Sequence, residues 1–191
     1  MSGLEKEPAE IPMGLAEGIR IVVLDVDGVL TDAGVYIGAT GRGEHVELKR
    51  FDIQDGIGIR FLKEAGIRVI VVSGRVSPAT AIRADELGIE CHQDPDADKL
   101  PLVKRLLDEA RVSWREVAMM GDDLADLPLL RTVGLPVAVA NAVTEVRDVA
   151  SWTTSIRGGS GAVREFARAL LMARGEWSGL VEEYCEARSG R

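Results

Sequence analysis

Short apolar runs recur along the chain and are separated by segments with a helical period. Four of them have the length and composition of buried strands: Ile19–Leu24, Val69–Val72, Val117–Met120 and Val137–Val139. Between the second and third runs, Pro78–Leu87 and Leu100–Ala110 are amphipathic, and Ile89–His92 is a further strand candidate. Alternating strands and helices predict an α/β fold, a doubly wound parallel sheet with helices on both faces.

One segment, residues 34–51, breaks this alternation. Gly34–Gly38 and His45–Phe51 alternate apolar and polar positions around the glycine-rich stretch 39–43. This pattern predicts a β-hairpin that follows the first strand and its loop. Two interpretations stay open: an ordinary surface hairpin, or a flap beside the site or an oligomer contact. We favour the second.

Composition narrows the class of protein. The 191 residues suffice for one domain with a full core. The net charge of -8 argues against nucleic acid as a partner. No apolar run reaches membrane-spanning length, and the N-terminus lacks an apolar signal region. Cys91 and Cys185 lack metal or redox spacing, so we expect reduced thiols in a cytoplasmic protein without a membrane partner.

The candidate chemistry lies where the first apolar run ends. Asp25 and Asp27 follow that run and precede Gly28, and ligands of α/β sheets bind beyond the carboxyl ends of strands. Two such acids repel each other unless a cation or a shared proton compensates. Gly121–Asp126 follows another apolar run and brings three more acids. Oxygen ligands without a nearby His or Cys set favour a hard cation, Mg²⁺.

These motifs resemble those of the haloacid dehalogenase (HAD) superfamily. The pattern Asp25-x-Asp27-Gly-Val-Leu-Thr, Ser73-Gly74-Arg75, Lys99 and Gly121-Asp-Asp-x-x-Asp126 occurs in the order of its four motifs. Asp55-Gly-x-Gly, Arg83-Ala and the segment Gly158–Glu165 resemble the subfamily that hydrolyses 3-deoxy-D-manno-octulosonate (KDO) 8-phosphate. The resemblance implies a Rossmann-like core with the β-hairpin insertion, a homotetramer built through the hairpin, and a cell-envelope polysaccharide precursor as product.

The intervals between these motifs leave no room for a separate cap domain. We expect a phosphatase domain over residues 19–177, a mobile leader over 1–18 and a C-terminal tail over 178–191. Water exclusion and substrate recognition then have to come from the hairpin, from the tail or from a neighbouring subunit. Oligomerisation is therefore a mechanistic expectation as well as one that the resemblance implies.

The resemblance assigns catalytic roles to the acids and to Lys99. Asp25 would be the nucleophile that forms an aspartyl-phosphate, and Asp27 the general acid and then the general base. Such an acid needs a raised pKa, which surrounding carboxylates can supply. Asp122, Asp25 and the backbone carbonyl of Asp27 would hold Mg²⁺.

The remaining motif residues would support this chemistry. Asp123 and Asp126 would support the metal site, although helix capping competes for Asp126. Ser73 and Gly74 would bind phosphoryl oxygens, and Lys99 would neutralise the phosphate. Arg75, Arg83 and Arg164 would bind the sugar acid phosphate, Arg164 in its own or in a neighbouring subunit. Surface ion pairs are the competing interpretation for all three arginines.

Three alternatives to KDO 8-phosphate hydrolysis remain at this stage. A phosphatase for nonulosonate 9-phosphates, which are relatives of sialic acid phosphates, would share all these motifs. A phospho-receiver also has an acid cluster and a lysine, but its acid pair comes early and its phosphorylated aspartate in mid-chain. A non-catalytic oligomeric module is the last alternative, although every catalytic acid is present.

Overall fold

Six parallel strands form the central sheet of this computed structural model, which describes residues 10–96 and 98–190. The strand order is β5-β4-β1-β6-β7-β8, and every neighbouring pair is parallel. The bounds are β1 Ile21–Leu24, β4 Arg68–Ser73, β5 Glu90–Gln93, β6 Val117–Gly121, β7 Leu135–Ala138 and β8 Trp152–Thr153. The predicted doubly wound α/β fold is confirmed; the short edge strand β8 was not predicted.

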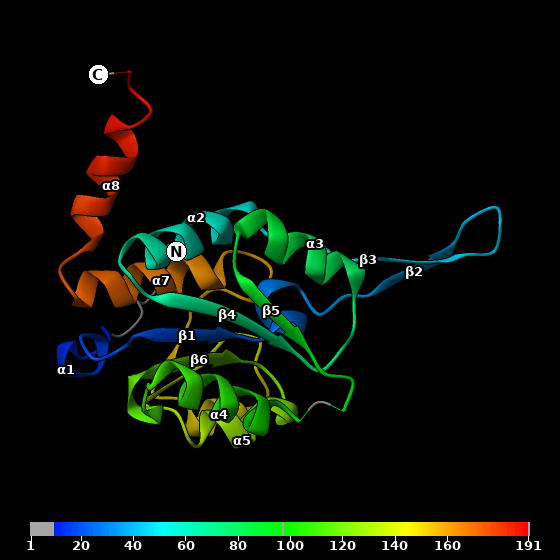
Figure 1. Cartoon of the computed structure of the whole chain (residues 1–191), viewed down its shortest axis with the longest axis horizontal. Coiled ribbons are helices and arrows are strands. Elements are labelled where there is room, and N and C mark those ends of the chain that lie inside the picture. The colour runs from blue at the N-terminus through cyan, green and yellow to red at the C-terminus, as the bar shows by residue number, and fades with distance from the viewer. Residues whose placement is uncertain (1–9, 97, 191) are drawn as a thin grey trace, which may run out of the picture.

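Helices cover both faces of the sheet, as the alternation of elements predicted. Figure 1 shows α2, α3 and α7 on one side and α4 and α5 on the other. The helices are α1 Met13–Ala16, α2 Ile53–Glu64, α3 Pro78–Leu87, α4 Lys99–Ala110, α5 Leu127–Leu130, α6 Thr144–Val149, α7 Ala162–Ala173 and α8 Trp177–Glu186. Buried aliphatic side chains of β1, β4 and β6 fill the space between the layers.

The order of the strands determines where a site can form. The chain moves outward from β1 to β4 and β5, and then returns to β6 on the other side of β1. Loops that leave β1 and β6 therefore diverge and open a crevice at their carboxyl ends. Both predicted aspartate motifs lie there, directly after β1 and at the end of β6.

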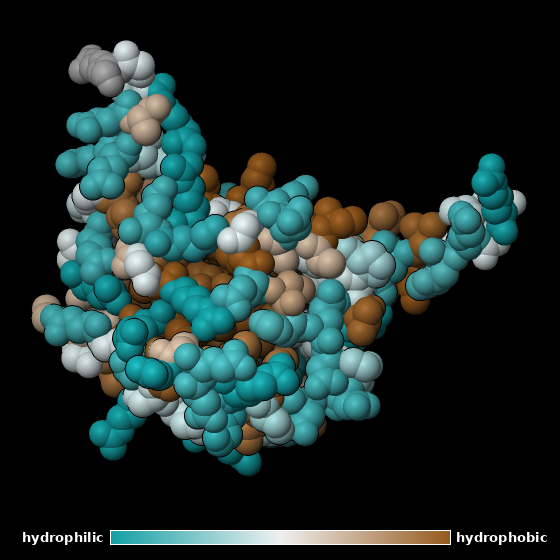
Figure 2. Space-filling view, viewed as in Figure 1, coloured by the Kyte–Doolittle hydropathy of each residue, from teal (hydrophilic) through white to brown (hydrophobic). Residues whose placement is uncertain are grey.

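Strands β2 (Tyr36–Ala39) and β3 (His45–Leu48) form the predicted hairpin, in antiparallel register. It projects from the domain as an isolated ribbon (Figure 1). Its base is fastened by an isolated bridge between Thr31 and Phe51. The hairpin carries exposed apolar side chains, which are brown in Figure 2 along the projecting arm.

The ends of the domain differ from the expected boundaries. The expected leader falls partly on residues 1–9, which lie outside the described residues. Ile11 and Ala16 of the next segment are buried in the core, so the packed domain begins before residue 19. At the other end α8 packs its Trp177 and Tyr184 rings edge-on against Phe61 of α2.

Helices α2 and α7 approach each other more closely than most side chains would allow. A Cβ added to Gly58 would lie 2.9 Å from the Cα of Arg164, so only glycine fits there without a backbone shift. Asp55, on the same helix, accepts a 2.8 Å hydrogen bond from the backbone N–H of Arg164 in the first turn of α7. The Asp55-Gly-x-Gly pattern is thus explained by the packing of these two helices.

Within the part of the chain that the structure describes, no helix combines the length and apolarity needed to cross a bilayer.

Candidate active site

The loop after β1 turns sharply and directs its two aspartates to different neighbours. Val26–Leu30 forms a turn that is kinked at Asp27 and Gly28, where the backbone is not helical, with Gly28 at a φ of 100°. A Cβ on Gly28 would lie 1.9 Å from Oδ2 of Asp122, so the absence of a side chain lets the second acidic motif approach. The Thr31 hydroxyl donates to the carbonyl of Val26 and accepts from the N–H of Gly28, which closes the turn.

Three carboxylates meet at the carboxyl ends of β1 and β6. Oxygen atoms of Asp25, Asp122 and Asp126 lie within 4.8 Å of one another. Lys99, at the start of α4, bridges two of them: its Nζ lies 2.5 Å from Asp25 and 2.7 Å from Asp126. The lysine side chain is only 4% exposed, so these contacts replace its lost hydration.

One buried lysine does not balance three carboxylates, and the pKa values reflect this. Burial, followed by the charge of Asp126, raises the pKa of Asp25 against the opposing effect of Lys99. Burial and the charges of Asp25 and Asp126 raise the pKa of Asp122 to about 8. Burial alone would lower the pKa of Lys99, but attraction to Asp25 and Asp126 outweighs it and leaves that pKa raised.

The donor set fits a hard divalent cation. Asp25 and Asp122 provide carboxylate oxygens that repel each other strongly when both are ionised, and a cation between them would remove that cost. All donors in the cluster are oxygen, the ligand type of Mg²⁺. Asp126 is already committed, because its two oxygens accept from Lys99 and from the N–H of Asp122.

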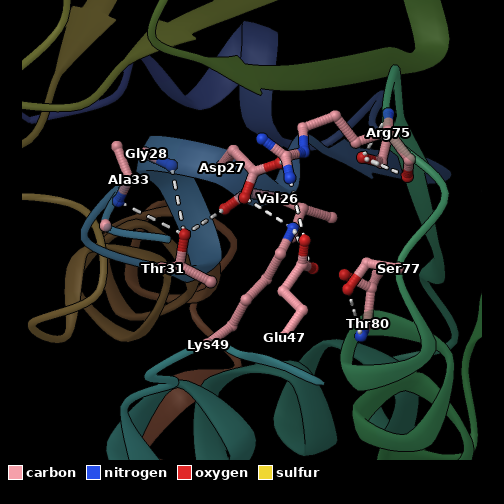
Figure 3. Close-up of polar contacts among 12 residues, drawn as sticks. Val26, Asp27, Gly28, Thr31, Ala33, Glu47, Lys49, Arg75, Ser77 and Thr80 are labelled. Carbon is pink, nitrogen blue, oxygen red and sulfur yellow. Dashed lines mark hydrogen bonds and ion pairs between the residues drawn. The ribbon is translucent and has the colours of Figure 1, made fainter. Parts of the chain in front are cut away.

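Asp27 lies outside this cluster and faces cations instead. Its Oδ1 is 2.6 Å from Nζ of Lys49, and its Oδ2 is 3.9 Å from Nε of Arg75. Figure 3 shows Lys49 and Arg75 reaching Asp27 from different segments of the chain. Arg75 also donates a 2.8 Å hydrogen bond to Glu47. The expectation that carboxylates would crowd Asp27 is wrong: they surround Asp25 and Asp122, because Asp27 leaves the strand after the turn has begun.

The other motif residues near the sheet edge make local contacts. Ser73 ends β4, and its hydroxyl accepts from the N–H of Arg75 and donates to the Arg75 carbonyl, so that it shapes the turn through Gly74. Asp123 is exposed and caps the short helix 124–126, where it accepts from the N–H of Leu124. The structure therefore does not bring Asp123 into the carboxylate cluster.

Two of the three arginines lie away from the cluster. Arg83 donates to the backbone carbonyl of Asp52 and to Glu86, and so ties α3 to the start of α2. Arg164 points between α2 and α8, with its guanidinium 4.5 Å from the centroid of the Trp177 ring. Its Nη1 is buried and has no hydrogen-bond partner in the described part of the chain. Packing determines where both side chains point, and within the described residues neither arginine contacts the carboxylate cluster of Asp25, Asp122 and Asp126.

Several residues of the site were not anticipated. Lys49 and Glu47 come from the hairpin, and their i,i+2 spacing in a predicted strand was the signal that they share one face. Asn141 donates to the carbonyl of Gly28 and accepts from the N–H of Gly158. Gly158 packs so closely on the β1 loop that an added Cβ would lie 1.7 Å from that same Gly28 carbonyl. The sequence pattern gives no signal for the contact between Gly158 and the β1 loop, which only the tertiary structure shows.

Comparison with known proteins places this geometry among phosphatases. A family model described as haloacid dehalogenase-like hydrolase matches residues 93–165. The chain is 41% identical over 164 residues to the 3-deoxy-D-manno-octulosonate 8-phosphate phosphatase KdsC of Salmonella typhi, covering 86% of this chain and 85% of that protein. The KdsC protein of Yersinia pestis is 40% identical, with 86% of each chain covered.

Solved structures agree with these relatives. A 3-deoxy-D-manno-octulosonate 8-phosphate phosphatase from Moraxella catarrhalis, in complex with magnesium, phosphate and KDO, superposes with a TM-score of 0.83 at 32% identity. It covers 90% of this chain and 97% of its own. The corresponding phosphatase from Yersinia pestis gives a TM-score of 0.82 at 38% identity, with 91% and 97% covered.

Proposed function

The chain belongs to the haloacid dehalogenase-like hydrolases, in the group of the KdsC phosphatases, and we propose that it is a Mg²⁺-dependent phosphatase for KDO 8-phosphate. The observation that carries this proposal is the position of Asp25. It lies at the carboxyl end of a central strand, inside a carboxylate cluster and against Lys99. The Moraxella relative binds magnesium, phosphate and KDO together, which supports the same ligands here.

In the proposed reaction Asp25 attacks phosphorus. A bond forms between its carboxylate oxygen and phosphorus, and the bond from phosphorus to the sugar oxygen breaks. Asp27 gives a proton to the departing sugar oxygen and then takes one from the water that hydrolyses the aspartyl-phosphate. Asp25 and Asp27 suit different roles because one sits among carboxylates and the other beside Lys49.

Phosphate charge has to be neutralised in an acidic protein. Mg²⁺ held by Asp25, Asp122 and the carbonyl of Asp27 would supply Lewis-acid stabilisation of the phosphoryl oxygens. Lys99 keeps Asp25 and Asp126 in place and adds positive charge. Ser73 and Gly74 form the turn whose hydroxyl and N–H groups would bind the phosphoryl group, and Arg75 lies near enough to Asp27 to contact the sugar acid.

The substrate is a sugar acid phosphate in both leading candidates. A nonulosonate 9-phosphate is the second candidate, because it presents the same phosphate and carboxylate groups to the same motifs. The curated relatives favour KDO 8-phosphate, since several are named for it. Arg83 and Arg164 lie away from the carboxylate cluster of their own chain. For either to bind substrate, a neighbouring subunit or a rearrangement has to bring it to the site.

We further propose a cytoplasmic homotetramer. The projecting hairpin exposes Tyr36, Ile37 and Leu48, and these residues line a shallow hollow on its surface. Exposed apolar side chains that lie together favour contact with a second protein surface. With no separate cap domain, a neighbouring copy could cover the open end of the sheet and exclude water from it.

Phosphate release tests the proposed function. Purified enzyme is assayed with KDO 8-phosphate and with a nonulosonate 9-phosphate, with and without Mg²⁺, for wild type and for Asp25→Asn. Mg²⁺-dependent turnover of KDO 8-phosphate that the substitution abolishes would establish substrate and nucleophile together. Faster turnover of the nine-carbon ester would keep the mechanism and replace the substrate. Absence of phosphatase activity on both esters would refute the proposal.

A further inference from the structure

We propose that Lys49, a residue of the hairpin, is a positioning residue that holds the carboxylate of Asp27 toward the leaving group. This inference rests on the proposed phosphatase function and deepens it. It assigns to the hairpin a part in the chemistry of its own subunit, in addition to any contact between subunits.

The ammonium group of Lys49 is buried although it stands on a projecting arm. The Lys49 side chain is 0% exposed, and its Nζ lies 2.6 Å from Oδ1 of Asp27, whose side chain is 23% exposed. A buried ammonium is costly unless it is paired and hydrogen-bonded. Glu47 is 4.0 Å away, so Asp27 is the carboxylate in direct contact within the described residues. The pair is therefore specific, and not an incidental surface contact.

Two features determine where the Lys49 side chain lies: the alternation of side chains along the hairpin, and the contacts of the two residues that follow it. Glu47 and Lys49 are two positions apart and face the site, whereas Leu48 between them points outward and is exposed. The next residue, Arg50, donates a 2.6 Å hydrogen bond to the carbonyl of Gly159. Phe51 then bridges to Thr31. Phe51 thus fastens the segment that carries Lys49 to the end of the loop that carries Asp27, and Arg50 fastens it to Gly159, whose N–H donates to Val29 of that loop.

Glu47 fixes the other side of this network (Figure 3). It accepts a hydrogen bond from Arg75 and lies at the edge of contact with Lys49. A hydrogen bond from the Ser77 hydroxyl, together with the charges of Lys49 and Arg75, lowers the pKa of Glu47. Glu47 is therefore an ionised anchor for the two cations that face the two oxygens of Asp27. Each oxygen then has a defined neighbour, which restricts rotation of the carboxylate.

When the leaving group is poor, displacement of the general acid from its position lowers the rate of the reaction strongly. A displacement of about 1 Å can reduce a rate by about 100-fold. The sugar alkoxide needs the proton from Asp27, whereas p-nitrophenolate leaves without one. Loss of Lys49 should therefore harm the sugar ester far more than the aryl ester. A residue that only stabilised the fold, or that only bound phosphate, would affect both esters alike.

The test compares Lys49→Met and Lys49→Arg with wild type, with Lys104→Met, at an exposed position of α4, as the matched control. Single-turnover phosphoryl transfer is measured with the sugar acid phosphate and with p-nitrophenyl phosphate. We expect Lys49→Met to lower the rate for the sugar ester about 100-fold with KM within about threefold, and the rate for the aryl ester less than about fivefold. Lys49→Arg, which keeps the charge, should retain more activity than Lys49→Met.

Equal losses on both esters, a change confined to KM, or identical behaviour of the Met and Arg variants would overturn the proposal. A crystal structure of Lys49→Met tests the contact without any substrate: the Asp27 carboxylate should leave its position, and an unchanged Asp27 would contradict us. Failure of wild type on every sugar acid phosphate would instead refute the proposed function. The crystal structure would still decide the positioning role in that case.

Discussion

The carboxyl end of the sheet and the projecting hairpin depart from ordinary burial in opposite ways. The sheet end buries charge: Asp25, Asp126 and Lys99 are all at most 5% exposed. The hairpin exposes apolar surface: Ile37 is 69% exposed and Leu48 is 62% exposed. Charged groups are seldom buried without partners, and contiguous apolar patches are seldom left in water. Each region therefore departs from the burial pattern that is usual for an isolated chain.

The difference lies in what would complete each region. The buried cluster has an excess of negative charge and donor oxygens, so a cation completes it. The hairpin has exposed aliphatic and aromatic groups, so an apolar protein surface completes it. Lys49 joins the two regions, because its backbone belongs to the hairpin and its ammonium group to the site. The proposed assembly and the proposed chemistry thus share one short segment of the chain.

The largest expected effect comes from the metal ligands. Asp122→Asn should lower Mg²⁺-dependent activity about 1,000-fold, because a metal that stabilises phosphoryl charge contributes several kcal/mol to the barrier. In metal-free protein near neutral pH the same change should raise the free energy of unfolding, since it removes one of three mutually repelling carboxylates. Assays with added Mg²⁺ and urea unfolding in EDTA measure the two effects.

Asp123→Asn is the matched control for that experiment. It lies next in sequence but is exposed and caps the short helix 124–126. It should change activity much less than Asp122→Asn does. Equal losses for the two variants would contradict the separation of Asp122 from Asp123 that the geometry indicates.

Removing Lys99, the buried cation of the carboxylate cluster, should destabilise the protein. Lys99→Met leaves Asp25 and Asp126 without their shared partner, and breaking a buried pair in this way costs about 3–5 kcal/mol. Mg²⁺ should restore part of the loss, because it supplies positive charge to the same cluster. Thermal unfolding with and without Mg²⁺ measures both effects. Unchanged stability in EDTA would show that the cluster is already protonated and does not depend on Lys99.

The hairpin should affect association and leave the fold intact. Tyr36 and Leu48 face each other across β2 and β3, and both are exposed. The double variant Tyr36→Ser/Leu48→Ser removes two large apolar groups, each worth about 1.5–3 kcal/mol if it is buried at a contact. We expect association to weaken at least about 100-fold, with the free energy of unfolding of the monomer changed by less than about 0.5 kcal/mol.

Sedimentation velocity over a range of protein concentrations measures that change. Met172→Ser on α7 is the control, because Met172 is also apolar and half exposed but belongs to a helix that packs against α1 and α8. Dissociation by the control and not by the hairpin variant would place the contact elsewhere. A monomeric wild type would refute the proposed assembly altogether.

The local pattern of apolar residues was sufficient to predict the main sheet and the positions of Asp25 and Asp122 at its edge. Apolar runs predicted β1, β4, β6 and β7, and their carboxyl ends share one edge in any parallel sheet, so Asp25 and Asp122 had to be near neighbours. The two-residue strand β8 was missed because a strand so short leaves no periodic signal. The packing of α1 was missed because its four helical residues were assigned to the mobile leader expected over residues 1–18.

Side-chain direction was harder to predict than backbone position. Arg164 has a flexible side chain, and the rings of Phe61 and Trp177 determine where its guanidinium lies. The role of Lys49 was not predicted, because an alternating pattern shows which residues share a face of a strand but not which face lies against the site. In both cases the deciding partner lies far away in sequence, where local pattern carries no information.

Asp55 is a further buried acid, and substituting it should give the smallest effect of the series and the sharpest contrast with the metal cluster. Its carboxylate is 1% exposed, and its Oδ1 accepts the N–H of Arg164 in the first turn of α7. Its Oδ2 has no hydrogen-bond partner among the residues that the structure describes. Burial raises the pKa of Asp55 to about 6, against the lowering effect of that backbone hydrogen bond. The fold therefore favours the protonated acid.

The sign of the pH dependence follows from this shift. Because the folded pKa lies above the unfolded value of about 4, the stabilising contribution is complete below pH 4 and is lost as the pH rises through about 6. Asp55→Asn cannot ionise, so its unfolding free energy relative to wild type should increase by about 1–3 kcal/mol between about pH 4 and pH 7.5. Urea unfolding at both pH values measures the difference, and Asp85→Asn, at an exposed position, is the control that should show almost none.

A stability of Asp55→Asn relative to wild type that falls as the pH rises would contradict this prediction. It would mean that the positive end of α7 stabilises the ionised Asp55 carboxylate more than burial opposes it. Asp55 would then be a charged helix cap, in contrast to Asp25 and Asp122 of the metal cluster, whose pKa values are raised.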